Sequence, residues 1–284
     1  MKNVTSISQQ EKAKLFYKLH YSKDILVLPN IWDCLGAILL ESLGYPAIAT
    51  ASAAVAFTNG YDDGEHIPFD ELLAILKKIA TSVNVPVTAD IESGFADTED
   101  QLKENIRQLI QTGVAGINFE DTDKKTNGLF PVEIQSQRIK AIRKVAGEMN
   151  VPLFINARTD VYVRGKGMDA PGAKLEEAIK RGAAYKTAGA DCFFPLAIQK
   201  EGDIKTIVEQ LQMPVNIILI TGVPELNVLH TIGVRRVSLG PGFLKIAIKA
   251  MKNLAVKLQQ CEGLADIISN EITSDYLISL VNKK

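Results

Sequence analysis

The stretch VPVTADIESGF, residues 85–95, ends an apolar run in two carboxylates, Asp90 and Glu92. A buried carboxylate is costly unless a cation or hydrogen bonds compensate its charge. Glu120 ends the apolar run AGINF in the same way. Clustered carboxylates repel one another unless a cation joins them, and a hard divalent ion takes oxygen ligands. The residues therefore predict a metal site, most naturally for Mg²⁺.

Other polar residues follow further apolar runs in the same manner. Ser52 follows PAIA and Arg158 follows VPLFIN, each within a few positions. The planar guanidinium of Arg158 matches a carboxylate group, so we expect it to bind an anionic substrate. Asp90 and the neighbouring carboxylates would hold the metal directly or through water. The alternative is that these carboxylates pair with Arg158 and nearby lysines, or cap helices.

Eight short apolar runs alternate with amphipathic segments along the chain. Such a pattern predicts an α/β fold with a parallel sheet covered by helices. Eight units in 284 residues fit one (β/α)₈ TIM barrel domain, spanning 1–284, better than an open sheet. The active site of such a barrel lies at the carboxyl ends of the strands, where the polar residues fall. The predicted strands are 25–29, 46–50, 85–90, 115–121, 151–158, 190–195, 215–220 and 235–240.

Additional helices are predicted at both ends of the chain. Residues 1–21 are expected to form an N-terminal helix, and residues 245–284 a C-terminal helical extension. Residues 263–284 keep an apolar face, which a helix must bury against something. Packing on the chain's own barrel is one alternative and contact with a second subunit is the other; we expect a homo-oligomer. The face comprises Leu264, Ile267, Ile268, Ile272, Leu277, Ile278, Leu280 and Val281.

The composition argues against several classes of partner. The net charge of −1 offers no basic excess for nucleic acid or for an anionic membrane surface. No apolar run reaches the length of about 18 residues that a membrane span needs. The polar start MKNVTSISQQ lacks the apolar core of a signal peptide. Three separated cysteines and no CxxC pair fit a reducing, cytoplasmic setting.

Five segments of the sequence resemble the isocitrate lyase/phosphoenolpyruvate mutase superfamily. They are TASAAVAFTNGYDDGE, TADIESGF, GVAGINFED, INARTD and AGADCFFP, and together they cover roughly residues 25–245. The resemblance implies a Mg²⁺-dependent barrel, in which Mn²⁺ could replace Mg²⁺, acting on a 2-oxo acid or an enolpyruvate-like species. It also implies C-terminal helices exchanged between subunits and a homotetramer built as a dimer of swapped dimers.

The same resemblance implies roles for individual residues. Asp90 corresponds to the direct metal ligand and Arg158 to the substrate-binding arginine. Three acidic residues correspond to groups that hold the metal's water shell. Three residues after the second strand correspond to the turn that receives the substrate's anionic end. The acidic residues are Glu92, Glu120 and Asp63, and the turn is Ala51, Ser52 and Ala53.

Residues 122–132, here called the lid segment, follow the fourth strand and are largely polar. Polar loops of this kind often close over a substrate and exclude water. Isocitrate and methylisocitrate lyases resemble one another in a K-[KR]-C-G-H lid whose cysteine is the catalytic acid/base, and this lid segment has neither Cys nor His. Lys125 and Asn127 can be matched to the lid of phosphonopyruvate enzymes with a one-residue gap. The mutase's tryptophan and histidine positions hold Ala49 and Pro195, which argues against mutase activity.

The shared chemistry that remains is cleavage next to a 2-oxo group, with a metal-stabilised enolate. We therefore expect a Mg²⁺-dependent carbon–carbon lyase or decarboxylase acting on a small, oxaloacetate-like 2-oxo dicarboxylate. Its catalytic residues would be Arg158, Glu120, Lys125 and Asn127. Decarboxylation is favoured because CO₂ leaves without a protein acid or base. Two alternatives stay open: a phosphonopyruvate-type P–C hydrolase or mutase, and a 2-oxo-acid-binding barrel with little catalysis.

Overall fold

The computed structural model describes residues 7–282 and contains a parallel strand in each of the eight predicted regions. The strands are short and mostly buried, which is why each reads as a compact apolar run in the sequence. They are β1 (Leu26–Leu28), β3 (Ile48–Thr50), β4 (Val87–Asp90), β5 (Gly116–Glu120), β8 (Phe154–Thr159), β9 (Cys192–Pro195), β10 (Asn216–Ile218) and β11 (Arg236–Ser238).

The strands form two parallel sheets. One sheet has the order β1-β11-β10, and the other has the order β2-β3-β4-β5-β8-β9, where β2 (Asn30–Ile31) follows β1 after a single proline. A parallel bridge between Phe193 and Val215 links the region of β9 to that of β10. This is an α/β fold with parallel sheets, consistent with a TIM-like barrel.

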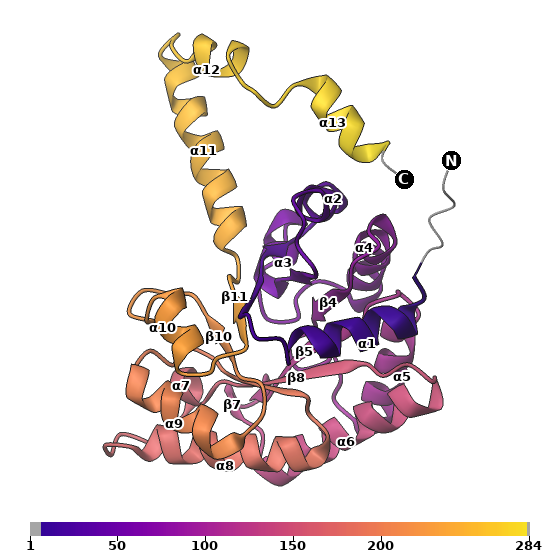
Figure 1. Cartoon of the computed structure of the whole chain (residues 1–284), viewed down its shortest axis with the longest axis vertical. Helices are drawn as coiled ribbons and strands as arrows, with labels where there is room; N and C mark the ends of the chain where they lie inside the picture. The colour runs from indigo at the N-terminus through magenta and orange to yellow at the C-terminus, as the bar shows by residue number, and fades with distance from the viewer. Residues whose placement is uncertain (1–6, 283–284) are drawn as a thin grey trace.

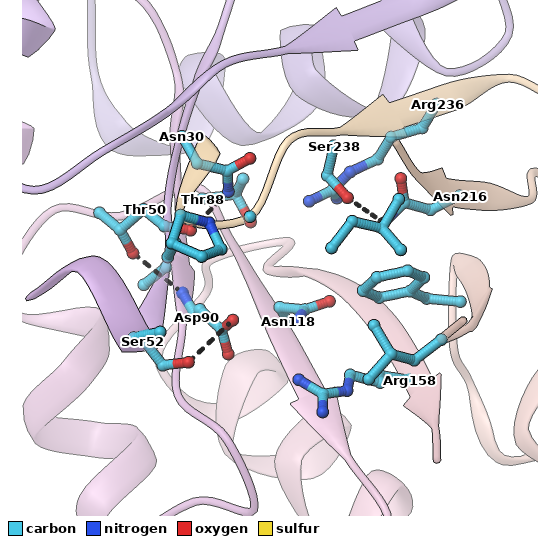
Figure 2. A pocket seen from close by; sticks show the side chains of 18 of the residues that line it. Asn30, Thr50, Ser52, Thr88, Asp90, Asn118, Arg158, Asn216, Arg236 and Ser238 are labelled. Atoms are coloured by element: carbon cyan, nitrogen blue, oxygen red, sulfur yellow. Dashed lines mark hydrogen bonds between the residues drawn. The ribbon is translucent and has the colours of Figure 1, made fainter. Parts of the chain in front are cut away.

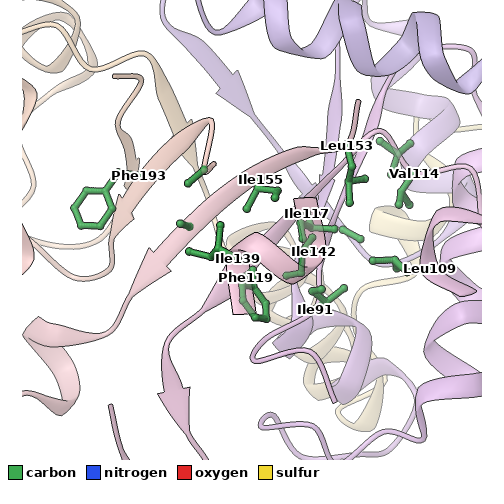
Figure 3. Close-up of a cluster of buried hydrophobic side chains, with 14 of the residues drawn as sticks. Ile91, Leu109, Val114, Ile117, Phe119, Ile139, Ile142, Leu153, Ile155 and Phe193 are labelled. Atoms are coloured by element: carbon green, nitrogen blue, oxygen red, sulfur yellow. The ribbon is translucent and has the colours of Figure 1, made fainter. Parts of the chain in front are cut away.

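Amphipathic helices cover the outer face of the strands (Figure 1). In α5, Leu102, Ile106 and Leu109 recur at helical spacing and are fully buried, so one face of the helix packs on the sheet. Figure 3 shows part of this cluster, to which Leu109 of α5 and Ile117 of β5 both belong. The covering helices are α2 (Cys34–Ser42), α4 (Phe69–Ser82), α5 (Glu99–Ile110), α6 (Val132–Glu148), α8 (Ala173–Ala188), α9 (Glu201–Leu211) and α10 (Leu226–Thr231).

The N-terminal helix α1 (Gln9–Leu19) packs on residues at the amino ends of the strands, among them Leu26 of β1 and Cys192 of β9. It begins with a capping box, in which Ser8 and Glu11 satisfy each other's backbone N–H groups. Phe16 is fully buried and packs with Leu28 and Phe154 in a separate apolar cluster. The predicted helix is therefore present over residues 9–19, whereas the part of that prediction on residues 1–6 lies outside the described residues.

Three helices occupy the predicted C-terminal extension: α11 (Gly242–Gln259), α12 (Leu264–Ile268) and α13 (Ser274–Val281). Figure 1 shows α11 projecting away from the strands and α13 returning beside α2. Leu280 of α13 is buried there, but Ile268 of α12 is 72% exposed. The apolar face is thus covered only in part by its own chain. Over residues 7–282, no helix is long and apolar enough to cross a membrane.

Candidate active site

A cavity of about 220 Å³ lies at the carboxyl ends of the strands (Figure 2). Six of the residues predicted for the site line it: Ala51, Ser52, Ala53, Asp63, Asp90 and Arg158. They come from the ends of β3, β4 and β8 and from the segment before α4, so strands distant in sequence bring them together. The helix α3 (Ser52–Thr58) begins at the cavity, with Ala51 as its N-cap and no side chain capping it. Its first backbone N–H groups therefore have no partner within the helix.

Asp90 is held in place by its neighbours at the end of β4. Its backbone N–H donates to Thr50 Oγ1 at 3.0 Å, and its carboxylate accepts from Glu92 N at 3.1 Å and from Ser52 Oγ at 3.4 Å. Burial raises the pKa of Asp90, although the nearby Arg158 opposes this. Within residues 7–282 its carboxylate forms no ion pair within 4 Å. A partly buried carboxylate that faces a cavity without a direct cationic partner suits a metal ligand.

The turn after β4 is strained in a way that its sequence accommodates. Glu92 has a φ of 50° and Gly94 a φ of 95°. Residues with a Cβ rarely adopt the φ of Gly94, and a Cβ there would also lie 2.7 Å from Leu102 Cδ1, so the position favours glycine. The Glu65 carboxylate accepts from Ser93 N at 2.9 Å and from Ser93 Oγ at 2.7 Å, which fixes the turn. Left-handed backbone at a non-glycine residue is a common feature of functional sites.

Glu92 and Glu120 do not line the cavity surface but share one lysine. Lys124 Nζ lies 2.6 Å from Glu92 Oε2 and 3.8 Å from Glu120 Oε1. Burial raises the pKa of Glu92 to about 7, even though Lys124 opposes it. Burial also raises the pKa of Glu120, against the effect of Arg158. The two carboxylates are therefore crowded and desolvated, a state that a further cation would relieve.

Arg158 is oriented by two carboxylates. Its Nε and Nη2 donate to Asp160 at 2.6 and 2.8 Å, and its Nη1 lies 2.8 Å from Glu120 Oε2. Burial opposes its charge, but Glu120 and Asp160 raise the pKa of Arg158 above its usual value. Two of the five N–H donors are bonded to Asp160, and the others remain for Glu120 and a ligand. The sequence analysis considered the alternative that a site carboxylate pairs with Arg158. The structure contains such an ion pair between Arg158 and Glu120.

The lid segment forms a hairpin of β6 (Thr122–Asp123) and β7 (Gly128–Leu129). Lys125, which is 69% exposed, pairs with Asp97 at 3.1 Å. Asn127 accepts a hydrogen bond from Arg164. Neither Lys125 nor Asn127 lines the cavity in this conformation. The lysine that reaches the carboxylates is instead Lys124, which the family pattern did not select.

Several polar residues of the cavity escaped the sequence analysis. Asn118, Asn216 and Arg236 line it from within β5, β10 and β11 rather than from beyond the strand ends. Only residues after each apolar run were considered as candidates. The sequence did offer a signal for these three residues. Inward-facing positions alternate along a strand, so a polar residue inside a buried strand can face the cavity.

The donor set fits a metal that keeps much of its water. Over residues 7–282, no three His, Cys, Asp or Glu side chains cluster closely enough to form an all-protein metal cage. Asp90 and Asp63 nevertheless line one cavity, and Mg²⁺ is commonly bound through one or two carboxylates with several waters retained. The residues therefore fit a hydrated Mg²⁺ held chiefly by Asp90.

Comparison with known proteins gives the family. The sequence model described as phosphoenolpyruvate phosphomutase matches residues 16–259, most of the chain. The chain belongs to the isocitrate lyase/phosphoenolpyruvate mutase superfamily. A superfamily relative, 2-methylisocitrate lyase of Bacillus subtilis (strain 168), is 33% identical over 73% of this chain and 67% of its own length.

Two further members of the superfamily are similar to the chain. The 2,3-dimethylmalate lyase of Eubacterium barkeri is 32% identical over 67% of this chain and 65% of its own length. The structure of oxaloacetate acetylhydrolase in complex with oxalate superposes with a TM-score of 0.84 and 20% identity, covering 97% of this chain and 95% of the other. At 20% identity, this structural similarity is evidence for the fold only. The relatives of the chain include carbon–carbon lyases and a phosphomutase, so the superfamily membership leaves the substrate open.

Proposed function

We propose that this protein is a Mg²⁺-dependent carbon–carbon lyase or decarboxylase that acts on a small, oxaloacetate-like 2-oxo dicarboxylate. One observation carries the proposal: Asp90, whose partly buried carboxylate has no ion-pair partner within residues 7–282, lines the same cavity as Arg158. A cation ligand and an anion receptor facing one small space suit an anionic substrate that also needs a metal.

Each side chain of the cavity has a distinct task in this proposal. When bound, Mg²⁺ would polarise the 2-oxo group and stabilise the charge that develops as the carbon–carbon bond breaks. Arg158, held rigid by Asp160, would bind and orient a carboxylate of the substrate. Ser52 and the backbone N–H groups at the start of α3 would receive its anionic end. Decarboxylation fits a lid segment without cysteine or histidine, since CO₂ needs no protein acid to leave.

Glu92, Glu120 and Asp63 would hold the water shell of the metal. Lys124 now neutralises the first two, so we expect it to move when a divalent cation binds. Lys125 now pairs with Asp97, and Asn127 with Arg164. Both would therefore reach the substrate only if the lid segment closed over the cavity. Their catalytic role thus depends on a movement of the hairpin.

The proposal extends to the assembly of the molecule. We propose that the eight strands close into a TIM barrel. In that barrel, β1 and β2 would together form one strand, and β9 would pair with β10. We further propose that the C-terminal helices are exchanged between subunits in a homotetramer, a dimer of swapped dimers. The exposed apolar residues of α11 and α12 support this.

A substrate panel tests the proposed function. Turnover of oxaloacetate and of phosphonopyruvate is measured with Mg²⁺ and with EDTA, and binding of oxalate, a mimic of the enolate, is measured by calorimetry. Release of CO₂ from oxaloacetate that stops with EDTA is the expected result. Turnover of phosphonopyruvate alone would replace the proposal with P–C bond cleavage. Oxalate binding without any turnover would indicate a binding protein.

A further inference from the structure

Arg236 lies deep in the cavity and has no part in the chemistry described above. It is the first residue of β11 and is only 2% exposed, yet its side chain lines the cavity. Figure 2 shows Arg236 and Arg158 at opposite ends of the cavity. On its inner side the guanidinium lies 5.9 Å from the ring of Phe16, which closes the amino ends of the strands. The charge therefore sits between an apolar floor and the cavity.

The guanidinium of Arg236 is unpartnered. Its Nε and Nη1 atoms are buried without a hydrogen-bond partner, and no ion pair within 4 Å involves it over residues 7–282. The adjacent Cys192 supplies no negative charge at neutral pH, because burial raises the pKa of its thiol to about 12. Burial lowers the pKa of Arg236 only to about 10, so the side chain stays charged. A buried charge without a partner normally costs several kcal/mol.

The side chains around Arg236 add further hydrogen-bonding groups. Asn216 Nδ2 donates to Ser238 Oγ at 3.3 Å, which leaves the Ser238 hydroxyl hydrogen available to an acceptor. Both residues line the cavity beside Arg236. Asn216 Oδ1 and Thr88 Oγ1 are also buried without partners, so this end of the cavity is polar and unsatisfied. Groups of this kind are normally satisfied by water or by a ligand.

We propose that Arg236, with Ser238 and Asn216, forms a second carboxylate site that binds the distal carboxylate of a dicarboxylic substrate. The inference rests on the proposed function, in which Asp90, the metal and Arg158 bind the 2-oxo acid end. A carboxylate at this place would turn an uncompensated buried charge into a charge-assisted ion pair. The site would select dicarboxylates over monocarboxylates, because a monocarboxylate leaves Arg236 unpaired.

A purely structural role for Arg236 makes the opposite prediction about stability. If the arginine served only to hold the fold, its replacement would destabilise the free protein. If Arg236 instead serves to bind a ligand, Arg236→Met removes an unpaired buried charge and keeps an unbranched side chain. The thermal stability of the free protein should then be equal or higher. The preceding residue, Arg235, provides a matched control, Arg235→Met, since its side chain donates to Ser22 O and does not line the cavity.

The test compares ligands that differ only in the distal carboxylate. Malate and lactate are titrated by calorimetry in the presence of Mg²⁺ into the full-length wild type, Arg236→Met and Arg235→Met, with oxalate as a probe of the metal end. We expect the wild type and Arg235→Met to bind malate about ten- to a hundredfold more tightly than lactate, as a charged hydrogen bond allows. Arg236→Met should bring that ratio close to one and change oxalate affinity by less than about threefold.

The outcomes separate this inference from the proposed function. Wild-type protein that fails to bind oxalate with Mg²⁺ would overturn the proposed function. Oxalate binding with an unchanged malate-to-lactate ratio in Arg236→Met would overturn the second carboxylate site alone. An equal loss of oxalate and malate affinity would also overturn it, because Arg236 would then act at the metal end. A lower melting temperature of Arg236→Met with an unchanged ratio would assign the residue to the fold.

Discussion

The metal hypothesis depends on Asp90, whose carboxylate is partly buried and faces the cavity. We expect Asp90→Ala to lower Mg²⁺ affinity by at least about a hundredfold, since the only direct ligand we assign is lost. Activity should disappear with it. The melting temperature should stay equal or rise, because repulsion with Asp63 is removed and a desolvated charge is gone. Titration calorimetry and thermal denaturation measure the two effects.

The matched control is Asp24→Ala, which removes an exposed carboxylate at the amino end of β1. It should leave Mg²⁺ affinity unchanged. If Asp90→Ala binds Mg²⁺ as tightly as this control, the assignment of the metal ligand is wrong.

His20 gives a second prediction at the residue scale, on stability against pH. The ring is fully buried, donates a hydrogen bond from Nδ1–H to Phe16 O at 2.8 Å and stacks on Phe154. Burial lowers its pKa to about 3, whereas the unfolded chain has the ordinary value near 6.5. Between these values the unfolded state binds the proton and the folded state does not. Folding stability contributed by a neutral His20 is therefore present above pH 6.5 and is lost as the pH falls.

We expect the free energy of unfolding of the wild type to fall, relative to His20→Phe, by about 1.4 kcal/mol for each pH unit between pH 6 and pH 4. Urea denaturation at fixed protein concentration and several pH values measures this difference in slope. Parallel pH curves for the wild type and His20→Phe would show that His20 is protonated in the folded state.

At the scale of elements, the lid segment is the part of the fold that we expect to move. Its hairpin is short, and its side chains are held by ion pairs with exposed partners such as Asp97. If the hairpin closes over the cavity when Mg²⁺ and oxalate bind, trypsin cleavage after Lys124 and Lys125 should slow by at least about fivefold. Mass spectrometry of timed digests identifies the sites. Cleavage after Lys23, at the other end of the strands, should be unaffected, and equal protection at all sites would argue against a lid.

The elements also show what sequence patterns can and cannot predict. All eight strand regions were predicted because buried parallel strands read as apolar runs bounded by turns. Six of the residues predicted for the site line one cavity because the carboxyl ends of parallel strands converge. The lid lysine could not be chosen this way, since adjacent residues of a hairpin point to opposite sides and its register sets which is inward. Lys124 reaches the carboxylates, and Lys125 does not.

Arg236 was missed for a different reason. It stands inside an apolar run, where the sequence RRVSLG offers two arginines without indicating which one faces the cavity. The three-residue strand β11 settles the choice, because Arg236 and Ser238 share one face. Polar residues at alternating positions of a buried strand therefore belong in any search for candidate site residues.

At the scale of the whole molecule, the C-terminal helices leave a large apolar surface uncovered. Ile246 and Ile248 of α11 are 67% and 50% exposed, and Ile268 of α12 also faces outward. An apolar cavity between α2, α11 and α13 is lined by Trp32 and Phe243. Patches of this kind on a folded chain usually mark an interface. Covering each large aliphatic side chain fully would contribute about 1.5–3 kcal/mol to association.

We therefore expect the intact protein to sediment at low micromolar concentration as a species several times heavier than its 31.0 kDa chain, near the mass of a tetramer. Deleting residues 263–284 should give a monomer or an insoluble chain. Because truncation can fail for other reasons, Ile246→Glu with Ile248→Glu offers a second route: two charges on the exposed face of α11 should weaken assembly without touching the buried Leu244. Lys249→Glu, an exposed charge reversal on the same helix, is the control and should leave assembly intact. A clean 31.0 kDa species for the unaltered protein would reject both the oligomer and the exchange of helices, and would leave α11 and α12 exposed in solution.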